Sequence, residues 1–153
     1  MEYLEEAKEE LKRVDHLVYV SLKYTRTADV MKSVIERIIN AFNFAILEIL
    51  EYAKEKKKLK DYPSAHGLRC DVLQKTFPEN TDLKEFLSFY QLLRRINRAE
   101  YSKREEYRRH VTMTTNMEDG EVIEINIDIL KEYYDKARTF VEFTRNLTGM
   151  KND

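Results

Sequence analysis

Cationic side chains gather in one short stretch of the chain, between residues 94 and 110, and two tyrosines lie among them. Arginine binds phosphate through two parallel hydrogen bonds, and tyrosine rings stack on exposed bases. This combination is typical of a surface for single-stranded RNA. The predicted RNA-binding residues are Arg94, Arg98, Tyr101, Arg108 and Arg109.

The same stretch contains carboxylates that could neutralise those cations. Glu100, Glu105 and Glu106 lie close to the arginines in sequence. Ion pairs between residues three or four positions apart stabilise solvated helix faces. A solvated, ion-paired face is therefore the simpler interpretation of the cationic stretch.

Metal, phosphate-loop and nucleophile chemistry find little support in the sequence. A di-metal helical bundle needs Glu-x-x-His on two helices, but Arg, Pro and Tyr stand three residues before His16, His66 and His110. Cys70 is the single cysteine, and the three glycines are scattered. This pattern excludes an intramolecular disulfide, a cysteine cluster for zinc and a glycine-rich phosphate loop. We expect no metal and no cofactor.

Length and charge predict one soluble domain spanning residues 1–153. The chain has 27 Lys and Arg against 28 Asp and Glu, so its net charge of -1 creates no overall attraction to nucleic acid. No apolar run reaches the roughly 18 residues of a membrane span, and the N-terminus lacks a cationic signal-peptide start. We therefore expect a cytoplasmic protein without a membrane partner.

The most apolar stretch predicts a long central helix at about residues 28–56. In its first half, apolar residues recur at helical spacing and polar residues share the opposite side. In its second half, Phe44 and Leu47 occupy the side that had been polar. A helix that is apolar nearly all round must be covered nearly all round. Phe44 and Leu47 are therefore the predicted interface of a homodimer, and the last helix is the alternative interface.

Periodicity predicts the other elements. Further helices are expected at about residues 2–24, 65–77, 82–97 and 128–147. Ser102 and Glu105 have the spacing of a capping box, which predicts a short helical turn. Across about residues 110–126, apolar and polar residues alternate on both sides of a turn at Asp119 and Gly120, which is typical of a β-hairpin. A disordered loop is the alternative there.

These elements together predict the fold class. We expect an all-α protein, an up-and-down four-helix bundle with an extra short helix and a small β-hairpin before the last helix. The hairpin would be an insertion in a single domain, since the sequence shows no internal repeat and no low-complexity linker.

Three stretches together resemble the HEPN superfamily of small helical-bundle domains. I-N-A-F-N-F-A-I-L-E-I-L looks like the second helix of the family. Y-P-S-A-H-G-L-R resembles the short connecting helix of one branch, and L-L-R-R-I-N-R-A-E-Y resembles the end of that branch's third helix. The resemblance covers roughly residues 34–101.

The resemblance implies two opposite functions. Active HEPN ribonucleases carry Arg, four to six residues and then His, and two subunits bring these pairs together across a dimer groove. Arg104 and His110 have five residues between them, so they are the catalytic candidates. The implied chemistry needs no metal: the histidine assists proton transfer at the ribose 2′-hydroxyl, and the arginine stabilises charge at phosphorus. The branch that the middle of the chain resembles often lacks this pair.

The favoured hypothesis is therefore a non-catalytic HEPN-like binding or accessory domain. It would act as a homodimer, with RNA or with a nucleotidyltransferase-type protein partner, as the resemblance implies. One alternative is a metal-independent endoribonuclease that uses Arg104 and His110. The other is a pure protein-interaction module, with the hairpin as its contact arm.

Overall fold

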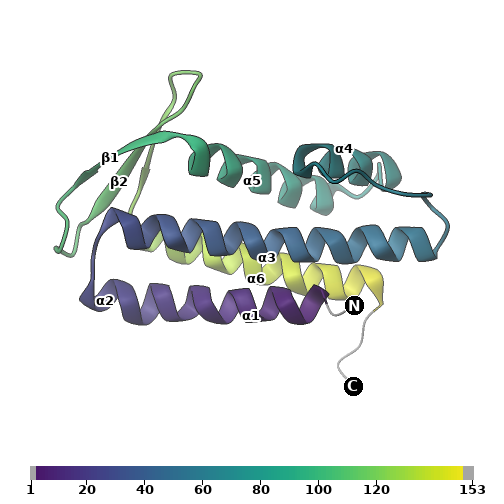
Figure 1. Cartoon of the computed structure of the whole chain (residues 1–153), viewed down its shortest axis with the longest axis horizontal. Helices are drawn as coiled ribbons and strands as arrows, with labels where there is room; N and C mark the ends of the chain where they lie inside the picture. The colour runs from purple at the N-terminus through teal and green to yellow at the C-terminus, as the bar shows by residue number, and fades with distance from the viewer. Residues whose placement is uncertain (1–2, 150–153) are drawn as a thin grey trace.

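The chain folds into long helices, with a small antiparallel sheet before the last one (Figure 1). The computed structural model describes residues 3–149. The elements are α1 (Tyr3–His16), the π-helical turn η1 (Leu17–Ser21), α2 (Leu22–Tyr24), α3 (Ala28–Glu55), α4 (His66–Thr76), α5 (Thr81–Arg98), β1 (Glu100–Arg104), β2 (Thr112–Asn116), β3 (Val122–Ile125) and α6 (Ile127–Thr148).

The predicted central helix is the helix around which the others pack. α3 contacts α1, α5 and α6, and α1 also contacts α6. Figure 1 shows α3 running opposite to α1 and in the same direction as α6, with the sheet at the end where α3 begins. The fold is therefore mostly helical, as the sequence predicts.

Aromatic rings form the middle of the core. Phe42 of α3 is fully buried, and its ring stacks on Phe140 of α6 with centroids 4.6 Å apart. The ring of Tyr90 in α5 also stacks on the Phe42 ring, with centroids 5.8 Å apart. Such pairs contribute about 0.5–1.5 kcal/mol each beyond the burial of their area. One side chain of α3 thus joins the two helices that flank it.

The outward side of α3 is only partly covered. Phe44 packs against the buried core yet keeps part of its ring exposed, and Leu47 is also partly exposed. Flanking helices therefore cover much of the surface that the sequence assigns to a homodimer partner, and the homodimer stays a prediction.

Polar side chains begin the long helices. The Thr27 hydroxyl accepts a hydrogen bond from the third backbone N–H of α3. The Asn80 side chain accepts a hydrogen bond from Leu83 N–H at the start of α5, and asparagine is among the preferred N-cap residues. Gly149 ends α6 with a left-handed φ of 71°.

The sheet is larger than the predicted hairpin. β2 and β3 form that hairpin, with Gly120 at a φ of 88° in its turn. The predicted helical turn at Ser102 and Glu105 is wrong, because residues 100–104 form β1, which pairs with β2. Ala99 already has extended backbone angles, and β2 offers pairing to every residue that follows up to Arg104. The backbone pairing of five residues with β2 stabilises the strand more than one capping box would stabilise a helical turn.

The faces of the sheet differ in polarity. Met113, Thr115 and Ile125 are buried on the face toward the helices, whereas Arg104 and Glu124 lie on the outer face and are exposed. Within residues 3–149, no helix is both long and apolar enough to span a membrane.

Candidate functional site

The structure distributes the cations of residues 94–110 over separate places. Arg94 lies over the ring of Tyr90, with its Cζ 5.7 Å from the ring centroid, and donates a hydrogen bond to Gln91 at 3.1 Å. Arg98 is exposed and lines a cavity of about 330 Å³ where α5 meets β1 and β2. The two predicted RNA-binding arginines of α5 therefore lie in different surroundings: Arg94 contacts Tyr90 and Gln91, and Arg98 lines a cavity.

Tyr101 is engaged within the chain. Its hydroxyl donates a hydrogen bond to Asp29 at 3.1 Å, and the Lys32 ammonium lies 5.2 Å from the centroid of its ring. The hydrogen bond to Asp29 raises the pKa of Tyr101. These contacts hold β1 against the first turns of α3.

The catalytic candidates Arg104 and His110 also lie in different surroundings. Arg104 ends β1 and donates to Glu124 of β3 at 2.9 Å, across the outer face of the sheet. His110 is exposed at the end of the loop between β1 and β2, where it lines a cavity. Among the residues that the structure describes, Arg104 is not part of that cavity's lining.

The cavity beside His110 has a volume of about 340 Å³, and three of its eight lining residues are Lys or Arg. Arg26, Arg109 and Lys131 line it, and Asp128 is the one carboxylate in its lining. Thr112, Asn126 and Ile127 complete the wall. We call this the cationic cavity.

Three distant segments form the cationic cavity. Arg26 comes from the turn between α2 and α3, Arg109 and His110 come from the β1–β2 loop, and Lys131 comes from the start of α6. Only the fold brings these segments together, so the sequence could identify Arg109 and His110 as candidates but not Arg26 or Lys131. Those two stand alone in sequence, without a motif.

Hydrogen bonds fix the β1–β2 loop onto the turn before α3. The Tyr107 N–H donates to the Arg26 carbonyl at 2.6 Å, and the Ala28 N–H donates to the Glu106 carboxylate at 2.9 Å. Glu105 and Tyr107 have left-handed φ values of 54° and 66°. Such angles are costly for residues other than glycine, so these contacts hold the loop in its shape.

The N-terminus of α6 forms part of the cavity wall, through Asn126, Ile127 and Asp128. The Asn126 side chain accepts a hydrogen bond from Ile129 N–H at 2.8 Å. The N–H groups of Ile127 and Asp128, in the first turn, have no intrahelical acceptor. Together with the helix dipole they favour an anion at this position.

Within the part of the chain that the structure describes, the cations of the cavity have no carboxylate partner. Within residues 3–149, Arg26, Arg109 and Lys131 form no ion pair, in contrast to Arg104. The Arg26 Nε atom is buried and lacks a hydrogen-bond partner. A buried donor without an acceptor is costly, so an anion that accepts from it would be stabilised. The arrangement can bind phosphate or carboxylate.

A second polar cluster, at α4, is built differently. Arg69 donates to the Pro63 carbonyl at 2.8 Å and lies over the ring of Tyr62. Burial, and then the guanidinium groups of Arg69 and Arg94, lower the pKa of His66. Burial raises the pKa of the Cys70 thiol to about 11, so the thiol is protonated near neutral pH and a poor nucleophile. Arg69 of this cluster therefore contacts other residues of the chain, Pro63 and Tyr62.

Within the described residues 3–149, no group of three or more His, Cys, Asp and Glu could hold a metal ion. No family model, curated protein or solved structure matches the chain.

Glu106→Ala tests the attachment of the loop. The variant loses the carboxylate that accepts from Ala28 N–H at the positive end of α3. We expect the free energy of unfolding to fall by about 1 kcal/mol, and Tm by about 2–4 °C. Thermal unfolding followed by circular dichroism measures this, with the exposed Glu118→Ala as a control of equal charge change. Equal Tm values for the two variants would contradict the role of Glu106.

Proposed function

We propose that the protein is a non-catalytic HEPN-like domain that binds a phosphate group of single-stranded RNA in the cationic cavity. The observation that carries the proposal is the convergence of Arg26, Arg109 and Lys131 on the first turn of α6, since none of them forms an ion pair within the described chain. The Lys131 ammonium lies 5.3 Å from the centroid of the Tyr19 ring. The helices would form the up-and-down four-helix bundle that the HEPN resemblance implies.

Each cation has a distinct role in this proposal. The Arg26 guanidinium would donate to a phosphate oxygen from the floor, since its Nε is buried and has no acceptor. Arg109 is exposed and would contact the phosphate from the entrance. Lys131 would add a compact charge beside the N–H groups of Ile127 and Asp128.

An exposed aromatic ring near the cavity supports a nucleic-acid ligand over a free anion. Tyr107 belongs to the same loop as Arg109, and its side chain is 72% exposed. Its backbone is held by the Arg26 carbonyl, so the ring is presented from a fixed loop. A base could stack on this ring while its phosphate occupies the cavity.

We propose binding without cleavage because the Arg104 guanidinium is already paired with the Glu124 carboxylate. Its guanidinium would have to leave Glu124, 2.9 Å away on the outer face of the sheet, to stabilise charge beside His110. Metal-independent cleavage by Arg104 and His110 stays the alternative, and the binding experiment below includes it. An accessory role beside a nucleotidyltransferase-type protein rests on the resemblance alone.

Binding of a fluorescently labelled, 5′-phosphorylated 12-nucleotide RNA tests the proposal. We expect Arg109→Ala and Lys131→Ala each to weaken binding about five- to tenfold at low salt and to reduce the salt slope by about 0.7. Fluorescence anisotropy at several salt concentrations measures both quantities. Lys75→Ala, on the exposed surface of α4, and Arg104→Ala are the matched controls.

Two results would contradict the proposed function. Equal weakening by Lys75→Ala and Arg109→Ala would mean that binding is a diffuse charge effect. Cleavage of the RNA in EDTA by the wild type, lost in His110→Ala, would replace binding by the ribonuclease alternative.

We further propose that the protein is a homodimer through Phe44 and Leu47 on the outward side of α3. Partly exposed apolar side chains at the middle of the longest helix support this proposal. Leu47→Glu should convert dimers to monomers in analytical ultracentrifugation, because a carboxylate is costly in an apolar interface. Ser88→Glu on α5 is the control. A wild type that stays monomeric at every concentration would exclude the homodimer.

A further inference from the structure

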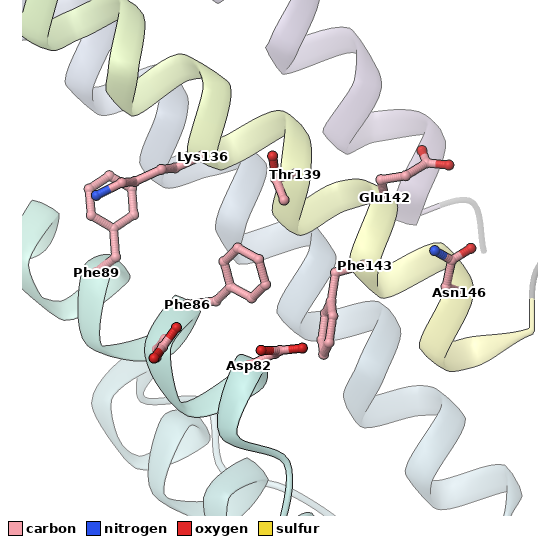
Figure 2. A pocket seen from close by; sticks show the side chains of 9 residues that line it. Asp82, Phe86, Phe89, Lys136, Thr139, Glu142, Phe143 and Asn146 are labelled. Atoms are coloured by element: carbon pink, nitrogen blue, oxygen red, sulfur yellow. The ribbon is translucent and has the colours of Figure 1, made fainter.

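A groove of about 540 Å³ runs between α5 and α6, on another part of the molecule than the cationic cavity (Figure 2). Phe86 and Phe89 of α5 and Phe143 of α6 line it. Figure 2 shows Phe86 and Phe143 side by side between the two helices. We call this the aromatic groove.

The groove exists because α5 and α6 meet through large rings. The Phe86 ring centroid lies 5.2 Å from that of Phe143, and the Phe89 centroid lies 5.2 Å from that of Tyr133. Tyr133 is buried in the core, but Phe86, Phe89 and Phe143 all keep part of their surface exposed. Three rings in a row thus offer apolar surface to a ligand.

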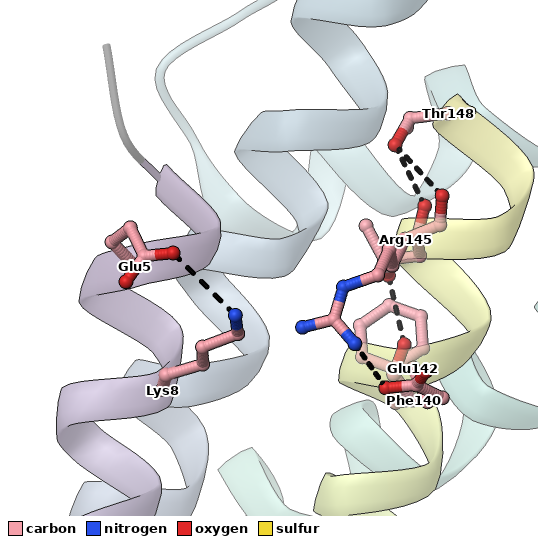
Figure 3. Close-up of polar contacts among 7 residues, drawn as sticks. Glu5, Lys8, Phe140, Glu142, Arg145 and Thr148 are labelled. Atoms are coloured by element: carbon pink, nitrogen blue, oxygen red, sulfur yellow. Dashed lines mark hydrogen bonds and ion pairs between the residues drawn. The ribbon is translucent and has the colours of Figure 1, made fainter. Parts of the chain in front are cut away.

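The rim of the aromatic groove is acidic. Within residues 3–149, Asp82 and Glu85 take part in no ion pair. Glu142 accepts a hydrogen bond from Arg145 at 2.6 Å (Figure 3), yet its side chain is 58% exposed. Two unpaired carboxylates therefore face whatever occupies the groove.

A cation already lies on one ring of the groove. The Lys136 ammonium stands 4.7 Å from the Phe89 ring centroid, as Figure 2 also shows. Three carboxylates in the lining, those of Asp82, Glu85 and Glu142, outnumber this one ammonium, so the groove favours a positively charged ligand. Charge complementarity thus predicts a basic ligand with an apolar side.

The dimensions favour a helix as that ligand. The lining on α6 extends from Lys136 to Asn146, which at the rise of an α-helix is about 15 Å. That length accommodates two to three helical turns, and a row of rings suits apolar side chains at positions i, i+3 or i+4, and i+7.

We propose that the aromatic groove docks a short basic amphipathic helix of a partner protein. Its apolar side chains lie on Phe86, Phe89 and Phe143, and its Lys or Arg side chains face Asp82 and Glu85. This interaction is independent of phosphate binding, because the groove and the cationic cavity share no lining residue.

The test is a selection from a phage-displayed library of randomised 14-residue helical peptides on the wild-type protein. Selected peptides are then synthesised and their Kd values measured by fluorescence anisotropy. The blocking variant is Thr139→Arg, because Thr139 is exposed and lines the groove. The matched control is Ser88→Arg, which adds the same side chain to an exposed position of α5 outside the lining.

We expect the selected peptides to carry an apolar stripe flanked by Lys or Arg. Thr139→Arg should weaken them at least about twentyfold by filling the groove, and Ser88→Arg by less than about twofold. Glu85→Gln combined with Asp82→Asn should weaken them about tenfold, since each exposed charge pair contributes modestly.

Several results would overturn the proposal. Selection of acidic or unpatterned peptides, no enrichment of any peptide, or equal binding to Thr139→Arg and Ser88→Arg would each exclude a basic helix. A wild-type dimer that Thr139→Arg converts to a monomer would assign the groove to a second copy of the chain.

Discussion

The attachment of the β1–β2 loop to the turn before α3 is the contact on which the cationic cavity depends. The Glu106 carboxylate accepts from Ala28 N–H at the start of α3, and Tyr107 N–H donates to the Arg26 carbonyl. These two bonds place Arg109 and His110 beside Arg26 in a loop that contains two left-handed residues. These bonds oppose the mutual repulsion of the cations that they bring together. The loop thus helps to gather three cations, Arg26, Arg109 and Lys131, that form no ion pair within residues 3–149.

The sequence predicts the helical part of the fold because the local apolar pattern and the tertiary packing favour the same helices. The apolar pattern of residues 28–56 predicts a helix that should be central, and α3 is the helix that contacts α1, α5 and α6. The hairpin was also readable, since its turn and alternating strands lie next to each other in sequence. The sequence does not predict β1, because Ser102 and Glu105 have the spacing of a capping box. The residues that pair with β1 belong to β2, on the other side of the loop.

The candidate site could be predicted only in part. Arg109 and His110 were identified from a local density of cations, but Arg26 and Lys131 join them through tertiary structure alone. The same cationic stretch is divided among different surroundings, because Arg94 lies over Tyr90 and Arg104 pairs with Glu124. Arg104 ends β1, and His110 lies in the following loop, two residues before Thr112, the β2 residue that pairs with Arg104.

The most direct test of phosphate binding in the cationic cavity is the amide spectrum of the protein during titration with the 5′-phosphorylated RNA. The account predicts that the N–H signals of Ile127 and Asp128, in the first turn of α6, shift progressively and saturate, because these donors face the phosphate. It also predicts that Arg109→Ala weakens this titration. Shifts confined to the outer face of the sheet around Arg104, with Ile127 and Asp128 unchanged, would contradict the account.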